Sequence, residues 1–186
     1  MATTTRVRRC HGWALIAGVL LPWAATPEGL PLSVAARAHW ADCAAGIREP
    51  AERPLRARRF GSTPEMSDLL LGLVLAGEKT ITSTSPWLYD DDLQAAPAVG
   101  DYWVVMDGAG KPSAVLRTTG VKTLPMNEVT EQESQFEGPS VRPIEAWRKV
   151  HWNFFTRVLT PLGKAPTESM PVTLEYFEVV CPRPVN

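Results

Sequence analysis

The sequence predicts one α+β domain, with a small barrel or curled sheet and flanking helices. Two amphipathic helical patterns, near residues 64–76 and 144–162, lie among short runs of strand-forming residues. The runs do not alternate with helices as βαβ units would, which argues against a doubly wound parallel sheet. A length of 186 residues with 19 basic and 20 acidic side chains is that of an ordinary soluble domain.

The first 38 residues have the layout of a secretory signal peptide. Three arginines precede an uncharged apolar run from Trp13 to Ala25, and Ala36-Arg37-Ala38 provides an A-x-A cleavage site. Pro22 interrupts the run, which is too short for a comfortable membrane span. We therefore expect a periplasmic or secreted protein without stable membrane insertion after cleavage. The alternatives are an uncleaved anchor, or a cytoplasmic protein with a misassigned start codon.

Cleavage after Ala38 also changes the charge of the chain. It removes four arginines and one glutamate, which leaves 15 basic and 19 acidic residues and a net charge of −4. A mildly acidic chain has no global basic field for non-specific nucleic-acid binding.

Residues 39–59 are predicted as an N-terminal helix and a basic connector. An alanine-rich helix runs from His39 to Gly46, and the arginine-rich segment up to Arg59 is interpreted as a solvated connector, with a phosphate-binding patch as the alternative. Cys43 and Cys181 either form one bridge or stay free thiols. The three histidines lie too far apart in sequence to suggest a zinc site, so we expect no metal and no cofactor.

The next segment contains the first strong helix pattern. Ser62 or Thr63 provides the N-cap, Pro64 fits the first turn, and Gly77 marks the end. One apolar stripe runs along this helix through Met66, Leu69, Leu70, Leu73 and Val74. The chain then turns into a strand, so a lysine and several hydroxyls emerge where helix gives way to strand. This junction is the candidate site.

The remaining elements follow in order. The acidic run Asp90-Asp91-Asp92 is expected in a hydrated loop. Residues 99–107 and 113–124 are predicted to form a hairpin, and residues 125–136 to be partly helical. A long helix spans 144–162, with Trp147 and Phe155 in the core and His151 as a hydrogen-bonded core residue. A last strand covers 172–180.

Six segments in collinear order resemble the ASCH superfamily. They include Leu73-Val74-Leu75-Ala76-Gly77-Glu78-Lys79-Thr80, Val99-Gly100-Asp101, Arg117-Thr118-Thr119 and Met170-Pro171-Val172. The others are Phe60-Gly61-Ser62 and Glu145-Ala146-Trp147-Arg148, which leads into His151-Trp152-Asn153-Phe154-Phe155. The resemblance covers residues 39–181 and implies a PUA-like β-barrel with flanking helices, with the ASCH-like domain at 60–181.

The same resemblance implies a function. Small ASCH proteins that hydrolyse N4-acetylcytidine use a lysine and a threonine of a G-x-K-x-x-T motif, which Gly77, Lys79 and Thr82 match, and a glutamate further along. Glu137 is the candidate glutamate, although an E-G-E-G-D stretch of larger members reads here Glu137-Gly138-Pro139-Ser140-Val141. Another member is described as a ribonuclease, and the superfamily was proposed to bind RNA. The alternatives are therefore a non-catalytic RNA- or nucleotide-binding module, or a ribonuclease.

Amide hydrolysis gives each candidate residue a role. Thr82 would be the nucleophile, Lys79 its base, and Glu137 the proton donor to the leaving amine. Trp87 and Tyr89 are candidates for stacking on a base, and Asp101 for orienting a site group or forming a turn. The expected partner is a small nucleoside-type ligand or single-stranded RNA.

Overall fold

The computed structural model describes residues 28–30, 32–47, 55–89 and 96–182. Most of the predicted signal peptide and the acidic run at 90–92 lie outside these residues. Within the described ranges, no helix is both long and apolar enough to cross a membrane.

The centre of the fold is a six-stranded sheet with the order β1-β2-β4-β5-β6-β3. The strands are β1 Glu28–Leu30, β2 Arg56–Arg58, β3 Ile81–Thr84, β4 Tyr102–Met106, β5 Pro112–Pro125 and β6 Pro171–Pro182. Only the β2–β4 pair is parallel among the described strands. The sheet stays open between β1 and β3, so the α+β prediction is confirmed with a curled sheet in place of a closed barrel.

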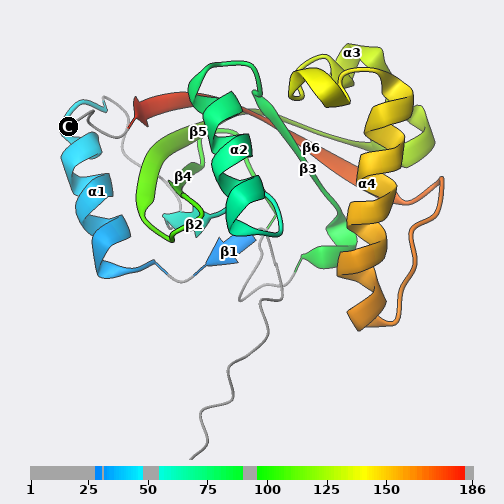
Figure 1. Ribbon diagram of the computed structural model, residues 1–186, viewed down its shortest axis with the longest axis horizontal. Helices are drawn as coiled ribbons and strands as arrows, with labels where there is room; N and C mark the ends of the chain where they lie inside the picture. The colour runs from blue at the N-terminus through cyan, green and yellow to red at the C-terminus, as the bar shows by residue number, and fades with distance from the viewer. Residues whose placement is uncertain (1–27, 31, 48–54, 90–95, 183–186) are drawn as a thin grey trace, which may run out of the picture.

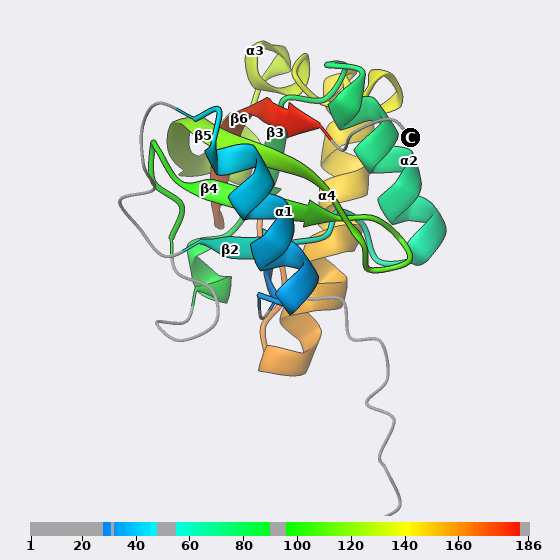
Figure 2. The same cartoon turned by 90° about the vertical axis from the view of Figure 1, so that its left-hand side faces the viewer.

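Four α-helices of the described residues flank this sheet: α1 Val34–Ala44, α2 Pro64–Leu75, α3 Glu131–Ser134 and α4 Ile144–Leu159. Short 3-10 helices cover Pro86–Leu88, Met126–Glu128, Pro139–Val141 and Thr160–Leu162. Figure 1 shows α1 at one end of the sheet and α4 at the other, with α2 between them. The quarter turn in Figure 2 shows α1 lying across β4 and β5, which agrees with its contacts to these strands.

The hydrophobic core has one part under each long helix. Under α4, Trp147 and Phe155 are buried against β6, as predicted. Under α2, Leu71 and Val74 pack with Trp103 of β4 and other residues of the sheet. Burial on both sides of the sheet fixes the positions of α2 and α4, between which the candidate site lies.

The N-terminal helix starts earlier than predicted. It begins at Val34 and ends at Ala44, whereas the sequence indicated residues 39–46. Ser33 caps it by accepting a hydrogen bond from the backbone N–H of Ala36, which is fully buried. The signal-peptide pattern hid this start, because small apolar residues satisfy both a cleavage site and a buried helix face.

The basic connector prediction is wrong for residues 56–58. These residues form β2, and the Arg58 side chain is buried, with a nitrogen 2.7 Å from a carboxylate oxygen of Glu175 in β6. The many arginines in this segment suggested that it is solvated. Arg58 is instead buried because its charge pairs with the carboxylate of Glu175, 117 residues further along the chain.

Cys43 and Cys181 form a disulfide. Of the two predicted alternatives, one bridge or two free thiols, the structure therefore shows the bridge. It joins α1 to the end of β6 across 138 residues, with the two Cα atoms 5.7 Å apart. The N-terminal helix is therefore covalently attached to the sheet.

Candidate active site

A cavity of about 460 Å³ opens between α2, α4 and the segment that follows α3. Pockets that bind small organic ligands commonly have volumes of 300–1,000 Å³. The α2 side of the cavity is apolar and is lined by Phe60, Met66, Leu69, Leu70 and Leu73. The polar end is defined by the contacting side chains of Lys79, Glu137 and His151. Thr82, Ser83 and Asn153 also line the cavity. An apolar slot with polar groups at one end suits a small ring system that bears a reactive polar substituent.

The apolar stripe of α2 is divided between the core and the cavity. Val74 of this stripe packs with Leu71 against the sheet. Met66 and Leu69 are 43% and 59% exposed and, with Leu73, line the cavity. Helical periodicity groups residues on one face, but it does not tell a core from a pocket wall.

The end of α2 delivers Lys79 into the cavity. Gly77 has φ +72° and its N–H bonds to Val74 O, while the N–H of Glu78 bonds to Leu73 O, as in a Schellman motif. The chain therefore leaves the helix sharply, and the N–H of Lys79 also bonds to Leu73 O. The Lys79 side chain is only 7% exposed.

Thr82 reaches the same cavity because β3 begins only at Ile81. In a regular strand, residues three apart point to opposite faces, so Lys79 and Thr82 would diverge. Lys79 lies before the strand, in the bend, while Ile81 enters the core and half-buried Thr82 faces the cavity.

Glu137 comes from the segment after α3. It is 4% exposed, and one carboxylate oxygen accepts a hydrogen bond from the ammonium of Lys79. Arg142 holds the two segments together, since its guanidinium donates to the backbone carbonyls of Glu137 and Glu78, each at 3.0 Å. Sequence analysis missed Arg142, because its partners are backbone carbonyls that leave no sequence signal.

The three ionisable groups at this end of the cavity determine the charge of Glu137. Burial acts to raise the pKa of Glu137, but the positive charge of Lys79 and the hydrogen bond and charge of His151 lower it to about 2. Glu137 is therefore ionised at neutral pH.

His151 is a second residue that sequence analysis did not place in the site. Its Nδ1 lies 2.9 Å from the carbonyl oxygen of Trp147, and its ring stacks on that of Trp147 with centroids 4.1 Å apart. The carbonyl only accepts, so Nδ1 carries the hydrogen. Nε2 then faces Glu137 Oε1 at 3.5 Å, as an acceptor when the ring is neutral and a donor when it is protonated. The predicted core histidine thus also lines the cavity.

Three other predicted site residues lie outside the cavity lining. Trp87, in a 3-10 helix, packs against the core under α4, and neither Trp87 nor Tyr89 is among the lining residues. Asp101 accepts a hydrogen bond from the N–H of Ala98 at 2.9 Å, which is the predicted turn role. Phe60 and Phe154 are the phenylalanines among the lining residues.

Both the sequence and the structure of this chain are similar to those of known proteins. The family model of the ASCH domain matches residues 56–181. The structure is similar to a crystal structure of an ASCH domain from Lactobacillus crispatus JV V101, with a TM-score of 0.71 and 28% identity over 78% of this chain and 93% of that chain. It is also similar to a protein from Enterococcus faecalis V583, with a TM-score of 0.68 and 30% identity over 78% and 88% of the two chains. A search of curated proteins found no match.

Proposed function

The chain belongs to the ASCH domain family, and we propose that its cavity binds a small nucleoside-type ligand and hydrolyses an amide on it, such as that of N4-acetylcytidine. Membership in the family supports a general module of the RNA-binding type. The hydrolysis rests on the contents of the cavity and on the resemblance of Gly77, Lys79 and Thr82 to the motif of the small hydrolases.

The observation that carries the proposal is the buried Lys79–Glu137 ion pair at the polar end of an open cavity, with Thr82 and His151 lining the same space. Burying two charges costs several kcal/mol per ion before their attraction is counted. Strongly perturbed ionisable groups in a cleft are typical of catalytic sites. The cavity leaves room beside the pair for a substrate amide.

The first step transfers the acyl group to the enzyme. Lys79 passes a proton to Glu137 along their hydrogen bond, and the neutral amine then takes the proton of Thr82 as Oγ attacks the acyl carbon. Glu137 gives its proton to the exocyclic nitrogen as the C–N bond breaks. The free amine leaves, and the acyl group remains as an ester of Thr82.

The second step restores the enzyme. Water attacks the ester, and Glu137 accepts a proton from it while Lys79 returns a proton to the Thr82 oxygen. The acid leaves, and proton transfer from Glu137 to Lys79 restores the ion pair. His151 supports both steps as a positioning residue, because its contact with Glu137 holds that carboxyl group beside Lys79.

The test is the release of cytidine and acetate from N4-acetylcytidine by the purified chain, measured by chromatography. We expect Thr82→Val and Lys79→Ala to lower kcat/KM by about 100-fold or more, in the range of general acid–base and nucleophilic contributions. Lys111→Ala is the matched control, because Lys111 is exposed and is not among the residues that line the cavity. A rate for the wild type equal to that of Lys79→Ala would contradict the proposal.

A second candidate is a module that binds RNA or a modified nucleotide without chemistry. The altered stretch from Glu137 to Val141, which lacks the second glutamate and the aspartate, favours it. Titration with short single-stranded RNA at several salt concentrations tests it, since phosphate contacts give a steep salt dependence. Labelled RNA, incubated with and without divalent metal, tests the ribonuclease alternative in the same samples.

A further inference from the structure

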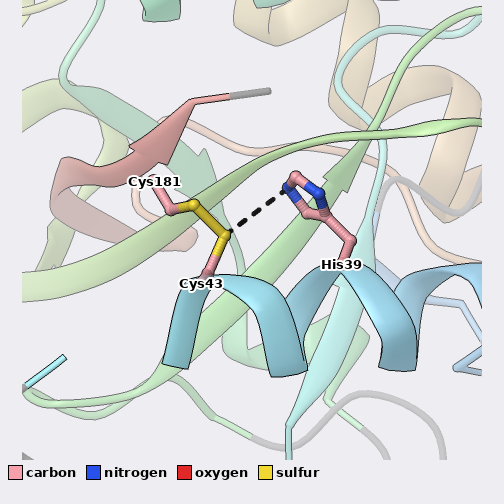
Figure 3. The surroundings of a disulfide bond; sticks show 3 residues. All are labelled: His39, Cys43 and Cys181. Atoms are coloured by element: carbon pink, nitrogen blue, oxygen red, sulfur yellow. Dashed lines mark hydrogen bonds between the residues drawn. A yellow bond between two sulfur atoms is a disulfide. The ribbon is translucent and has the colours of Figure 1, made fainter. Parts of the chain in front are cut away.

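The disulfide that attaches α1 to β6 has a histidine beside it (Figure 3). His39 lies one helical turn before Cys43, and its Nε2 is 3.9 Å from Cys43 Sγ. Cys43 is buried, while His39 and Cys181 are partly exposed. Within the described part of the chain, His39, Cys43 and Cys181 are the one group of three potential metal donors. Their donor atoms all lie within 4.8 Å of one another.

The spacing of these donors matches a tetrahedral metal site. Zinc binds thiolate sulfur at about 2.3 Å and imidazole nitrogen at about 2.0–2.1 Å, which places neighbouring ligand atoms roughly 3.5–3.8 Å apart. The His39–Cys43 separation of 3.9 Å is already close to that value. The two sulfurs need only move apart once their bond is broken, and the Cα separation of 5.7 Å leaves room for this through side-chain rotation.

We propose that reduction of the Cys43–Cys181 disulfide creates a binding site for a thiophilic divalent cation of the zinc class. The protein ligands are His39 Nε2 and the two cysteine sulfurs, and the fourth tetrahedral position is open to water. A dithiol reductant supplies two electrons and two protons, the S–S bond breaks, and the reductant ends as its own disulfide. The cation then displaces both thiol protons and binds the thiolates.

This site is independent of the cavity and of the family match. His39 and Cys43 precede residues 56–181, so two of the three ligands come from the N-terminal segment of this chain. The oxidised pair has no thiolate to offer, so disulfide and cation exclude each other. In the reduced chain, the cation restores the link between α1 and β6 that reduction removes.

The experiment compares oxidised and reduced protein in a variant that lacks the remaining cysteine and the histidine next to it. All proteins carry Cys10→Ser and His11→Gln, because Cys10 is the third cysteine and His11 lies next to it. Each protein is reduced with a dithiol, freed of reductant without oxygen, and titrated with zinc against a chromophoric chelator. Cobalt(II) gives a second readout, because thiolate ligation produces a charge-transfer absorption.

We expect one zinc per reduced chain and none per oxidised chain, and at least tenfold weaker binding in His39→Ala. Zinc should raise the Tm of the reduced parent but not of reduced His39→Ala, since a ligand that binds only the folded state stabilises it. Circular dichroism and disulfide formation in oxidised His39→Ala verify its fold. Equal binding by oxidised and reduced chains, unchanged affinity in His39→Ala, or a reduced chain that zinc does not refold or bind would overturn the proposal.

Discussion

Glu137 is the residue on which the charge of the cavity depends. It is the anionic partner of buried Lys79 and also faces His151 at 3.5 Å. Removing the carboxylate leaves a buried ammonium without its counter-ion, which costs far more than an exposed pair would. The same contacts that suit catalysis therefore also hold the end of α2 against the segment after α3.

The first prediction concerns Glu137→Gln and pH. At neutral pH we expect this change to lower the free energy of unfolding by about 3–5 kcal/mol, as for other broken buried pairs. The folded pKa of Glu137 lies below its ordinary 4.5, since Lys79 and His151 outweigh the effect of burial and lower it to about 2. The stabilisation is thus complete above pH 4.5 and is lost as the pH falls toward 2.

The measurement is urea unfolding of the wild type and Glu137→Gln at several pH values. Another buried carboxylate titrates in the same range: burial raises the pKa of Glu133, but hydrogen bonds from Lys122 and Thr130 lower it to about 2. It is present in both proteins, so their difference at each pH isolates Glu137. A difference that stays constant from pH 6 to about 2.5 would contradict the assignment.

Arg58 of β2 is a second buried charge. It pairs with Glu175 at 2.7 Å and stacks over the Trp103 ring at 3.6 Å from its centroid. Trp103 Nε1 and the hydroxyl of Thr118 also donate to Glu175. The carboxylate thus links β2, β4 and β5 to β6 inside the sheet.

The second prediction compares two arginines that both pair with glutamates of β6. Arg58→Met leaves Glu175 buried without its cation, and we expect a loss of about 3–5 kcal/mol in the free energy of unfolding. Arg117→Met removes a partly exposed pair with Glu178, separated by 3.6 Å, and we expect a change of at most about 1 kcal/mol. Urea denaturation of both variants decides, and equal losses would refute the role of burial.

At the scale of elements, α2 both supports the sheet and forms the cavity wall. Its C-terminal turn fixes where Lys79 enters, and this turn depends on the positive φ of Gly77. Gly72 lies inside the same helix, and a Cβ added there meets no atom within 4 Å. The glycine-to-alanine substitution can therefore be compared at a helical position, Gly72, and at a left-handed position just after the helix, Gly77.

The third prediction uses this pair of glycines. Gly72→Ala should stabilise the protein by about 0.5–1 kcal/mol, because alanine loses less backbone entropy in a helix. Gly77→Ala should destabilise it by about 1–2 kcal/mol, because a left-handed conformation strains any residue with a Cβ. Only Gly77→Ala should also lower the proposed hydrolysis, since it displaces Lys79. Thermal melting of the two variants gives the sign, and a stabilising Gly77→Ala would contradict the turn.

For the whole molecule, the sequence predicted most elements of the ASCH fold correctly. Local signals were strong for α2, the β4–β5 hairpin, α4 and β6, and the structure has all of them. The resemblance to the family's motifs pointed to Lys79, Thr82 and Glu137, and these three residues line one cavity. Contacts between distant segments left no such signal, which is why buried Arg58 and the placement of His151 beside Glu137 escaped prediction.

The N-terminal region combines the signal-peptide prediction with a folded helix. We propose that the chain is exported and cleaved after Ala38, and the Cys43–Cys181 disulfide supports this, because such bonds persist in oxidising compartments. Cleavage at that point would remove strand β1, which pairs with β2, together with Ser33 and the first five residues of α1. His39 and Cys43 remain in the chain, and the disulfide would hold the shortened helix on the sheet.

The fourth prediction is the N-terminal residue of the exported protein. Signal peptidases cut during export, before the chain folds, so the helical start at Val34 does not protect the site in α1. We expect N-terminal sequencing of protein from the periplasm or medium to begin at His39, and Ala36→Leu with Ala38→Leu to leave the precursor uncut, because cleavage needs small residues there. Ala35→Leu is the control, because it lies outside the A-x-A positions. An intact N-terminus on protein that stays in the cytoplasm would contradict export.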